Sequence, residues 1–373
     1  MSHRDQASTT ARQRTTHRLV PWLVLASAAL GCSQSEPAGP ALPASGSAEA
    51  SAARVVVTSL LDDGDGTCTT LRCTLRDAIG TAPPGADVTF ADKLCPRRAT
   101  PATGCRILLT GGQLDIGKPL RIVGPSGYSL AVDGGLTAAA VLAIGPGASV
   151  AVSRLTISRG SANGIVNGGS LSLDGVTVSG SGSGAGNGGG ISNGTGSAVT
   201  LTSSTVSGNV GSFGGGIYNA NGGAVTLSGS TVSGNTGGSG AGVFNLGGTL
   251  ALTNSRVTGN TALGSGGGIF NWSNGVTTLT SSTVSDNSAA SDAGGIWTEG
   301  GSVTLSGTSV IRNSSGARGG GIFANGPVSL TRKSCVNNNS ASSITSPDPW
   351  NPVNIFLFAF GTVTGPNCGV AQP

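Results

Sequence analysis

The sequence predicts an all-β fold, a right-handed parallel β-helix with three short strands and about 26 residues in each coil. Three series of apolar residues recur with this period along residues 150–340, and Gly, Ser and Asn separate them. Each segment alternates apolar and small polar residues, which is the periodicity of a strand. A single repeat of this length cannot bury its apolar face alone, so neighbouring repeats stack. We therefore expect each coil to bury Val, Leu and Ile against the coils on either side.

The three series define the three strands of a coil. The first strand is Val-Thr-Leu or a close variant, as at Val199–Leu201, and the second centres on a valine about five residues later. The third strand holds an Ile or Val after a small-residue pair, usually Gly-Gly. The central valines are Val178, Val206, Val232, Val257, Val284, Val310 and Val336. The third-strand residues are Ile191, Ile217, Val243, Ile269, Ile296 and Ile322. The period is too short for propeller blades, which need about 40 residues.

Asparagine also falls in register, three residues after the central valine. These positions are Asn209, Asn235, Asn260, Asn287, Asn313 and Asn339. A second set lies two residues after the third-strand residue, at Asn167, Asn193, Asn219, Asn245 and Asn271. Side chains stacked at the strand spacing of about 4.8 Å can pass amide hydrogen bonds along the axis. We interpret the asparagines as a structural ladder, and a ligand-binding strip is the alternative.

An aromatic residue follows the third-strand residue in five successive repeats. The set is Tyr218, Phe244, Phe270, Trp297 and Phe323. Alternation places these rings on the face opposite the isoleucines, so inward isoleucines would turn the rings outward. An exposed stripe of rings would suit a carbohydrate or protein ligand. Rings covered by a loop or by the C-terminal segment would be packing instead, and the sequence leaves both readings open.

The N-terminus is typical of an export signal. Residues 1–18 are polar and basic, and residues 19–31 are apolar but shorter than the roughly 20 residues of a membrane-spanning helix. The stretch that ends in Gly31-Cys32 resembles a bacterial lipobox, although Ala29 and Leu30 depart from its usual pattern. We predict a lipoprotein signal over 1–31 with lipidation at Cys32, and an ordinary secretory signal is the alternative. Residues 32–53 then read as a flexible tether.

Six cysteines remain beyond Cys32, which fits an oxidising compartment. They lie in three sequence-near pairs, Cys68 with Cys73, Cys95 with Cys105 and Cys335 with Cys368. Six cysteines allow fifteen pairings, so proximity alone suggests this one. A zinc site is the competing reading, but no C-x-x-C pair occurs and histidine is absent after His17.

The segment 57–68 (VTSLLDDGDGTC) together with 73–79 (CTLRDAI) resembles the CSLREA domain of bacterial surface proteins, with Thr74 and Asp77 departing from it. The glycine triplets at 214–219 (GGGIYN) and 266–271 (GGGIFN) resemble repeats of polymorphic outer-membrane proteins, although the F-x-x-N half does not match. These resemblances imply a cell-surface or secreted β-helix with a fold related to that of pectate lyases.

The CSLREA-like region, residues 54–140, is expected to hold an N-terminal cap and the first coils, before the repeats of 141–340. Leu71, Leu75, Ala78 and Ile79 recur at helical spacing, so a short helix is predicted to plug the open end of the first coil. The aspartates at 62, 63 and 65 could bind calcium, but carboxylates in a turn are more often only solvated. We therefore expect no cofactor.

The repeats offer few candidate catalytic residues. Residues 141–340 hold four acidic residues, Asp174, Asp286, Asp292 and Glu299. Asp286 is in register with Arg312, and Asp292 with Arg318, so lateral ion pairs are predicted. The leading hypothesis is a non-catalytic, lipid-anchored surface protein for adhesion, polysaccharide binding or envelope structure. The alternative is a divergent polysaccharide lyase acting on acidic glycans, which would use an arginine or lysine base.

Partners follow from the charge. The net charge is +4, and without the first 31 residues, which hold four arginines and one aspartate, it falls to +1. Nucleic acid is therefore not an expected partner. The expected partners are a membrane, through the lipid anchor, and a polysaccharide or surface protein, with the chain itself a monomer.

Residues 341–373 are predicted to form a C-terminal cap. Residues 355–360 (IFLFAF) are the most apolar run after the signal, and an exposed run of this kind would aggregate. The open end of a β-helix needs a cover, so we expect this run on the last coil, held by a Cys335–Cys368 disulfide.

Overall fold

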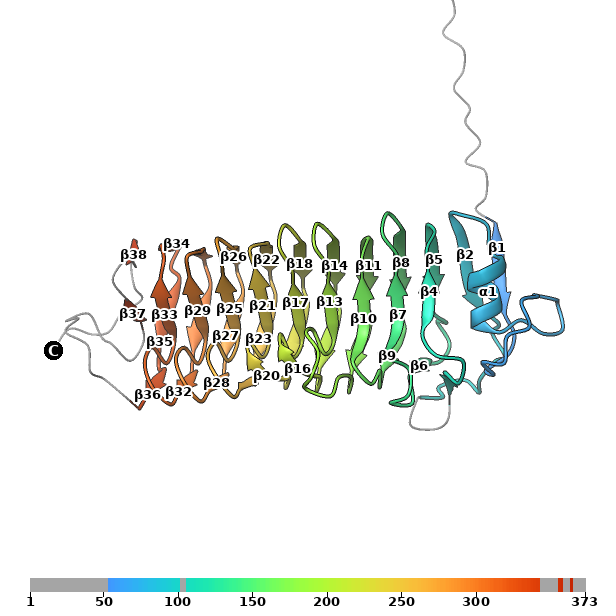
Figure 1. Ribbon diagram of the computed structural model, residues 1–373, viewed down its shortest axis with the longest axis horizontal. Helices are drawn as coiled ribbons and strands as arrows, with labels where there is room; N and C mark the ends of the chain where they lie inside the picture. The colour runs from blue at the N-terminus through green and yellow to red at the C-terminus, as the bar shows by residue number, and fades with distance from the viewer. Residues whose placement is uncertain (1–52, 101–104, 343–354, 358–362, 365–373) are drawn as a thin grey trace, which may run out of the picture. The chain divides into compact units, whose positions relative to one another are not determined.

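The computed structural model describes residues 53–100, 105–342, 355–357 and 363–364. Over these residues the strands form four parallel sheets that wind into a right-handed parallel β-helix, as the sequence predicted (Figure 1). One coil passes through a strand of each main sheet in turn, and the next coil adds its strand beside the previous one. Corresponding repeat residues are register partners, as Val199 is with Val225, so the sequence period is the period of the stack.

We number the four sheets 1 to 4. Sheet 1 contains β1 (Arg54–Val57), β2 (Ala86–Phe90), β5 (Leu120–Val123), β8 (Ser149–Ser153), β11 (Ser170–Asp174), β14 (Ala198–Thr202), β18 (Ala224–Ser228), β22 (Thr249–Thr253), β26 (Val276–Thr280), β30 (Ser302–Ser306), β34 (Val328–Thr331) and β38 (Val363–Thr364). Sheet 2 contains β3 (Arg106–Leu108), β6 (Ala131–Asp133), β9 (Thr156–Ser158), β12 (Thr177–Ser179), β15 (Thr205–Ser207), β19 (Thr231–Ser233), β23 (Arg256–Thr258), β27 (Thr283–Ser285), β31 (Ser309–Ile311) and β35 (Cys335–Asn337).

Sheet 3 contains β4 (Leu114–Ile116), β7 (Ala140–Ile144), β10 (Asn163–Asn167), β13 (Ile191–Asn193), β17 (Ile217–Asn219), β21 (Val243–Leu246), β25 (Ile269–Trp272), β29 (Ile296–Glu299), β33 (Ile322–Asn325) and β37 (Ile355–Leu357). Sheet 4 contains β16 (Val210–Phe213), β20 (Thr236–Ser239), β24 (Thr261–Ala262), β28 (Ser288–Ala289), β32 (Ser314–Ser315) and β36 (Ser340–Ala341). Sheets 1 to 3 correspond to the three predicted strands of each coil, and sheet 4 is a fourth that the sequence did not reveal.

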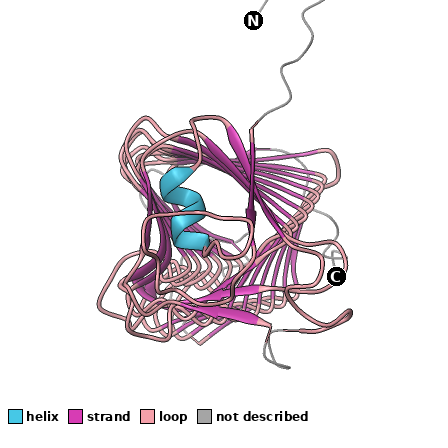
Figure 2. Ribbon diagram, turned by 90° about the vertical axis from the view of Figure 1, so that its right-hand side faces the viewer, coloured by secondary structure: helices cyan, strands magenta, loops and turns pink. Residues whose placement is uncertain are grey.

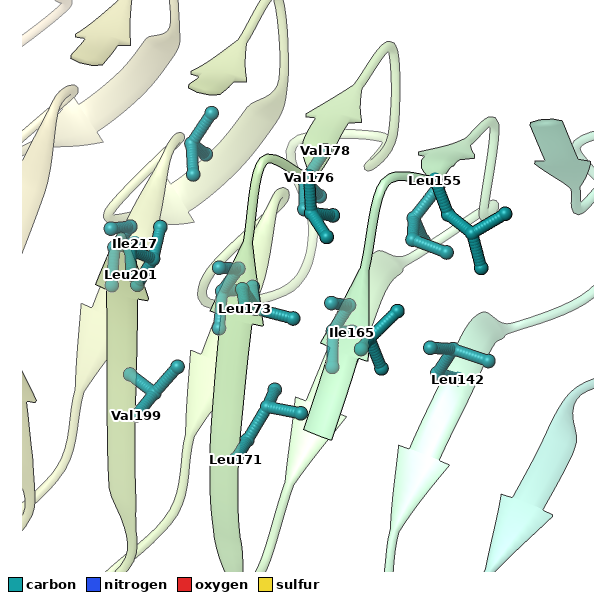
Figure 3. Close-up of a cluster of buried hydrophobic side chains, with 14 of the residues drawn as sticks. Leu142, Leu155, Ile165, Leu171, Leu173, Val176, Val178, Val199, Leu201 and Ile217 are labelled. Carbon is teal, nitrogen blue, oxygen red and sulfur yellow. The ribbon is translucent and has the colours of Figure 1, made fainter. Parts of the chain in front are cut away.

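The main hydrophobic core of the described residues runs inside the stack and is made largely by the inward side chains of sheets 1 to 3. Leu171 and Leu173 of β11 and Val178 of β12 are 2% exposed or less, and the same positions recur in the neighbouring coils (Figure 3). The column of glycines before each third-strand residue lets the chain turn tightly into this core. A β-carbon on Gly242 would lie 2.8 Å from Val257 Cγ1 and would also meet the carbonyl of Gly268, so only glycine fits there.

The helix α1 (Leu75–Thr81) covers the N-terminal end of the coils, as predicted (Figure 2). Thr74 caps it: the backbone N–H of Asp77 donates to Thr74 Oγ1, whose own proton goes to Asp77 Oδ2 at 2.7 Å. Leu75, Ala78 and Ile79 are buried against the core, but Leu71 is 92% exposed. The prediction for Leu71 was wrong because the helix begins only after Thr74.

At the C-terminal end, the apolar run continues the stack. The strand β37 pairs in parallel with β33, so Ile355 lies beside Ile322, and β38 pairs with β34. Residues 355–357 thus add a rung to sheet 3, while 358–360 lie outside the described residues. Among the described residues, no helix is both long and apolar enough to cross a bilayer.

Candidate functional site

The predicted asparagine positions form a continuous ladder inside the corner that follows sheet 2. The Nδ2 group of Asn235 donates to Oδ1 of Asn260 at 2.9 Å and to the carbonyl of Val206 at 3.1 Å. The backbone N–H of Asn235 donates to the same Oδ1 at 3.0 Å. This pattern repeats from Asn209 to Asn339, and side-chain amide bonds of 2.8 to 3.1 Å link the six residues. Asn209 to Asn313 are fully buried and Asn339 is 7% exposed, so the ladder offers no surface to a ligand.

Two further polar ladders run beside it. The second asparagine set links Asn167 through Asn271 by Nδ2–Oδ1 bonds of 2.7 to 2.8 Å, and Asn271 then donates to Thr298 Oγ1. A hydroxyl ladder, which sequence reasoning missed, joins sheets 1 and 2. Its members are Ser204, Ser230, Ser255, Ser282, Thr308 and Ser334. Each hydroxyl lies two residues before a central valine, and that spacing was the signal that could have revealed it.

The five predicted aromatic rings form a column on the outer face of sheet 3. The rings of Phe244 and Phe270 are stacked with centroids 4.8 Å apart, and those of Phe270 and Trp297 are 3.8 Å apart. Tyr218 stacks on Phe244 at one end and Phe323 lies beyond Trp297 at the other, where Arg318 sits over its ring. The outward direction of these rings follows from strand alternation, because Ile217 and its equivalents point inward.

Most of this column is covered. Phe244, Phe270 and Phe323 are 8% exposed or less, while Tyr218 and Trp297 are half-buried. The cover is the glycine-rich corner before each sheet 3 strand: a β-carbon on Gly266 would lie 2.9 Å from the Phe270 ring. The rings therefore act largely as a packing layer between sheet 3 and the corner. The most exposed aromatic side chains on this surface lie outside the column.

Two aromatic side chains that sequence reasoning missed lie on this surface. Phe213 is 40% exposed with its ring 5.0 Å from that of Phe244, and Trp272 is 43% exposed. Trp272 meets the rings of Phe244 and Phe270 edge-on, at 6.2 and 6.4 Å. The signal for Trp272 was its place two residues after Phe270, which is again outward by alternation. We call Phe213, Tyr218, Trp272 and Trp297 the aromatic face.

Polar groups continue the aromatic face along the axis. On sheet 3 the rung partner of Trp272 is Glu299, and the partner of Glu299 is Asn325. Both polar side chains are half-buried. A ligand lying along the axis would therefore meet an indole ring first and hydrogen-bonding groups one and two rungs later.

Two of the four acidic residues of the repeats are held by arginine, as the register indicates. Arg312 Nε and Nη2 donate to the two carboxylate oxygens of Asp286 at 2.7 and 2.9 Å, and Arg318 holds Asp292 in the same two-pronged way. The hydrogen bond from Arg312 lowers the pKa of Asp286. Both carboxylates are held by a two-pronged arginine, an arrangement that suits stability better than proton transfer.

The aspartates of the N-terminal turn are also held by arginine. Asp62 is buried, and its two carboxylate oxygens accept hydrogen bonds from Nε and Nη2 of Arg76, each at 2.9 Å. One of these oxygens also accepts the backbone N–H groups of Thr110 and Gly111. Asp63 and Asp65 pair with Arg72. Across residues 53–100 and 105–342, no three Asp, Glu, His or Cys side chains gather in a way that could hold a metal ion.

Two of the sequence-near cysteine pairs are disulfides, Cys68–Cys73 and Cys95–Cys105. Cys335 is also disulfide-bonded, while Cys368 lies outside the described residues. The predicted signal of 1–31, the lipidation site Cys32 and the tether up to residue 52 lie outside them too.

No known protein family matches the chain, and no curated protein matches it either. The solved structures to which the chain is similar in fold include the following two. The crystal structure of pectate lyase Pel9A is 12% identical, with 80% of this chain and 81% of that chain covered and a TM-score of 0.49. The product of ORF18 of Geobacillus virus E2 is 13% identical, with 83% of this chain and 62% of that chain covered and a TM-score of 0.42.

Proposed function

We propose that the chain is a non-catalytic, lipid-anchored β-helix displayed at the cell surface, and that its aromatic face binds polysaccharide. The observation that carries the proposal is the partly exposed pair Phe213 of sheet 4 and Trp272 of sheet 3, whose rings both contact that of Phe244. The half-buried rings of Tyr218 and Trp297 belong to the same aromatic column as Phe244. Aromatic rings present a flat apolar surface with a polar rim, which suits the apolar faces of sugar rings.

The axial spacing supports a polymer rather than a single sugar. Successive rungs of sheet 3 place equivalent side chains about 4.8 Å apart, close to the length of one residue in an extended polysaccharide. Trp272, Glu299 and Asn325 occupy three successive rungs of one outward column. A chain along this column could stack on the indole and give hydrogen bonds to the carboxylate and the amide.

The binding role is tested with the full chain on an array of polysaccharides. The variant Trp272→Ala should lose roughly tenfold in affinity for the best glycan, because exposed aromatic side chains at the centre of a contact carry much of its energy. The control Leu263→Ala removes an apolar side chain that is 71% exposed but lies on the loop after sheet 4. Equal affinities of the wild type and Trp272→Ala would contradict the proposal, as would release of unsaturated uronates in an ultraviolet assay.

Surface anchoring is tested separately. The lipobox-like stretch supports a lipid anchor at Cys32, and the resemblance to CSLREA-domain and polymorphic outer-membrane proteins supports display at the cell surface. The variant Cys32→Ala should leave the detergent phase on partitioning and take up no labelled fatty acid. Unchanged partitioning and labelling would show that Cys32 is not the anchor.

A further inference from the structure

A basic groove runs along the corner between sheets 1 and 2 in the first coils, far along the chain from the aromatic face. Its larger hollow has a volume of about 970 Å³, and its lining includes Lys93, Arg97, Arg98 and Tyr128. A second hollow of about 540 Å³ shares Arg98 and Tyr128 and continues past Arg154 to Thr177. We call these two hollows together the basic groove.

Among the described residues, the lining of the groove holds four cations and one carboxylate, so its net charge is positive. Seven arginines elsewhere form ion pairs with aspartates, namely Arg72, Arg76, Arg106, Arg121, Arg159, Arg312 and Arg318. Within residues 53–100 and 105–342, by contrast, Lys93, Arg97, Arg98 and Arg154 form no ion pair, and all four are exposed. Asp92 is the one carboxylate in the lining.

Several bonds hold the walls of the groove. The Cys95–Cys105 disulfide closes the loop that carries Arg97 and Arg98, and the backbone N–H of Arg98 donates to the carbonyl of Gly127 at 3.1 Å. The backbone N–H of Ser129 donates to the carbonyl of Ala99, and the Tyr128 hydroxyl donates to the carbonyl of Ala91 at 2.8 Å. A preorganised site loses less entropy on binding than a mobile one.

The shape of the groove indicates an extended ligand. Thr156 donates its N–H to the carbonyl of Leu130, and Thr177 to that of Leu155, so these lining residues belong to three successive coils. The groove therefore follows the axis, and Ser129, Thr156 and Thr177 line its second hollow together with Arg98 and Arg154. Cations concentrated at one end, and hydroxyl-bearing residues with one further cation along the remainder, suit an anionic chain that also carries hydroxyls.

We infer that the basic groove binds an acidic polysaccharide, as a second site that is independent of the aromatic face. The carboxylates of a polyuronate would pair with Lys93, Arg97 and Arg98, and its hydroxyls would bond to the serine and threonine side chains. A flat bilayer would fit less well, because the cations line a hollow that continues along the axis.

The test measures binding of alginate oligosaccharides, neutral dextran and phosphatidylglycerol vesicles to the full chain, with Cys32→Ala in every sample to remove anchoring. Alginate should bind at low salt and weaken as salt is added, since exposed charges are screened. The double variant Lys93→Gln/Arg97→Gln should bind alginate roughly tenfold more weakly. The control Arg332→Gln/Lys333→Gln removes two exposed cations from the far end of the stack and should change the affinity less than about twofold.

The variant Trp272→Ala should retain alginate binding, which separates this site from the aromatic face. Absence of alginate binding by the wild type at low salt would overturn the inference. Equal losses in the two double variants would show that net charge, and not the groove, binds alginate. Binding of the vesicles but not of alginate would assign the cations to a lipid surface and would overturn it as well.

Discussion

Each ladder asparagine is bonded to the coils on both sides of it. The Oδ1 atom of Asn260 accepts the backbone N–H and the Nδ2 group of Asn235, while its own amide donates to Asn287 and to the carbonyl of Val232. An asparagine offers donor and acceptor groups in one planar amide, which no apolar residue of similar size can replace. The side chain therefore belongs to three coils at once.

Replacing Asn260 by Leu should lower the free energy of unfolding by about 1–3 kcal/mol, because buried donors and acceptors on both neighbouring coils lose their partners. Chemical denaturation measures the change. The same substitution at the exposed Asn221 serves as the control and should be nearly neutral. We expect Asn339, at the end of the ladder, to be less sensitive than Asn260. Equal and negligible effects at all three positions would show that the amide bonds do not stabilise the fold.

The two tyrosines of the chain should both ionise at a higher pH in the folded chain than in the unfolded chain. Burial raises the pKa of Tyr218, and burial together with the charge of Asp92 raises the pKa of Tyr128. Because the folded pKa lies above the unfolded value of about 10, the protonated phenol favours folding, and this contribution is lost as the pH rises through the folded pKa. An ultraviolet titration should show phenolate at higher pH in the native chain than in denaturant. Coincident curves would contradict the burial of both rings.

At the scale of the element, glycine decides how closely the corner approaches the core. A β-carbon on Gly242 would lie 3.0 Å from Asn260 Nδ2 and 2.8 Å from Val257 Cγ1, so the substitution Gly242→Ala must displace the ladder or the core. We expect it to cost about 1–3 kcal/mol, the usual range for overpacking. A β-carbon on Gly117 would meet nothing within 4 Å, so Gly117→Ala is the matched control. Similar melting temperatures for the two variants would refute the steric argument.

The sequence predicted the elements that carry an apolar signal and missed those that do not. The Val-Thr-Leu and valine series mark sheets 1 and 2 because their alternating side chains fill the core. Sheet 4 has strands as short as Thr261–Ala262, with no apolar alternation to detect. Its strands pair because the neighbouring coils hold them in register. Such strands form as a result of the stacking, so their own residues do not predict them.

The sequence predicted only part of the candidate site. Alternation predicted the outward direction of Phe244 and Phe270, but their burial depends on the glycine corner folding back over them. That cover is a tertiary contact between backbone and ring, and no local pattern encodes it. The basic groove was missed because Arg98, Tyr128 and Arg154, which line it together, are far apart in sequence and are brought together only by the stacking of the coils.

At the scale of the whole molecule, the last strands protect the end of the stack. The strands β37 and β38 occupy the open sides of β33 and β34, whose backbone groups would otherwise be free to pair with another chain. Truncation before Ile355 should therefore give oligomers in size-exclusion chromatography with light scattering. The control is the full-length Cys335→Ser/Cys368→Ser variant, which keeps the strands and lacks both thiols. A truncated chain that stays monomeric and equally heat-stable would show that the run is not a cap.

The in-register stack also bears on how such a protein can change in length. The coils from β14 to β25 all carry the same three ladders, the same glycine corner and the same apolar triad, so a duplicated copy of one of these coils would find matching contacts on both sides. Gene duplication of one repeat would then lengthen the outer column by one ring and a fixed step. The number of repeat copies would then set the length of the stack.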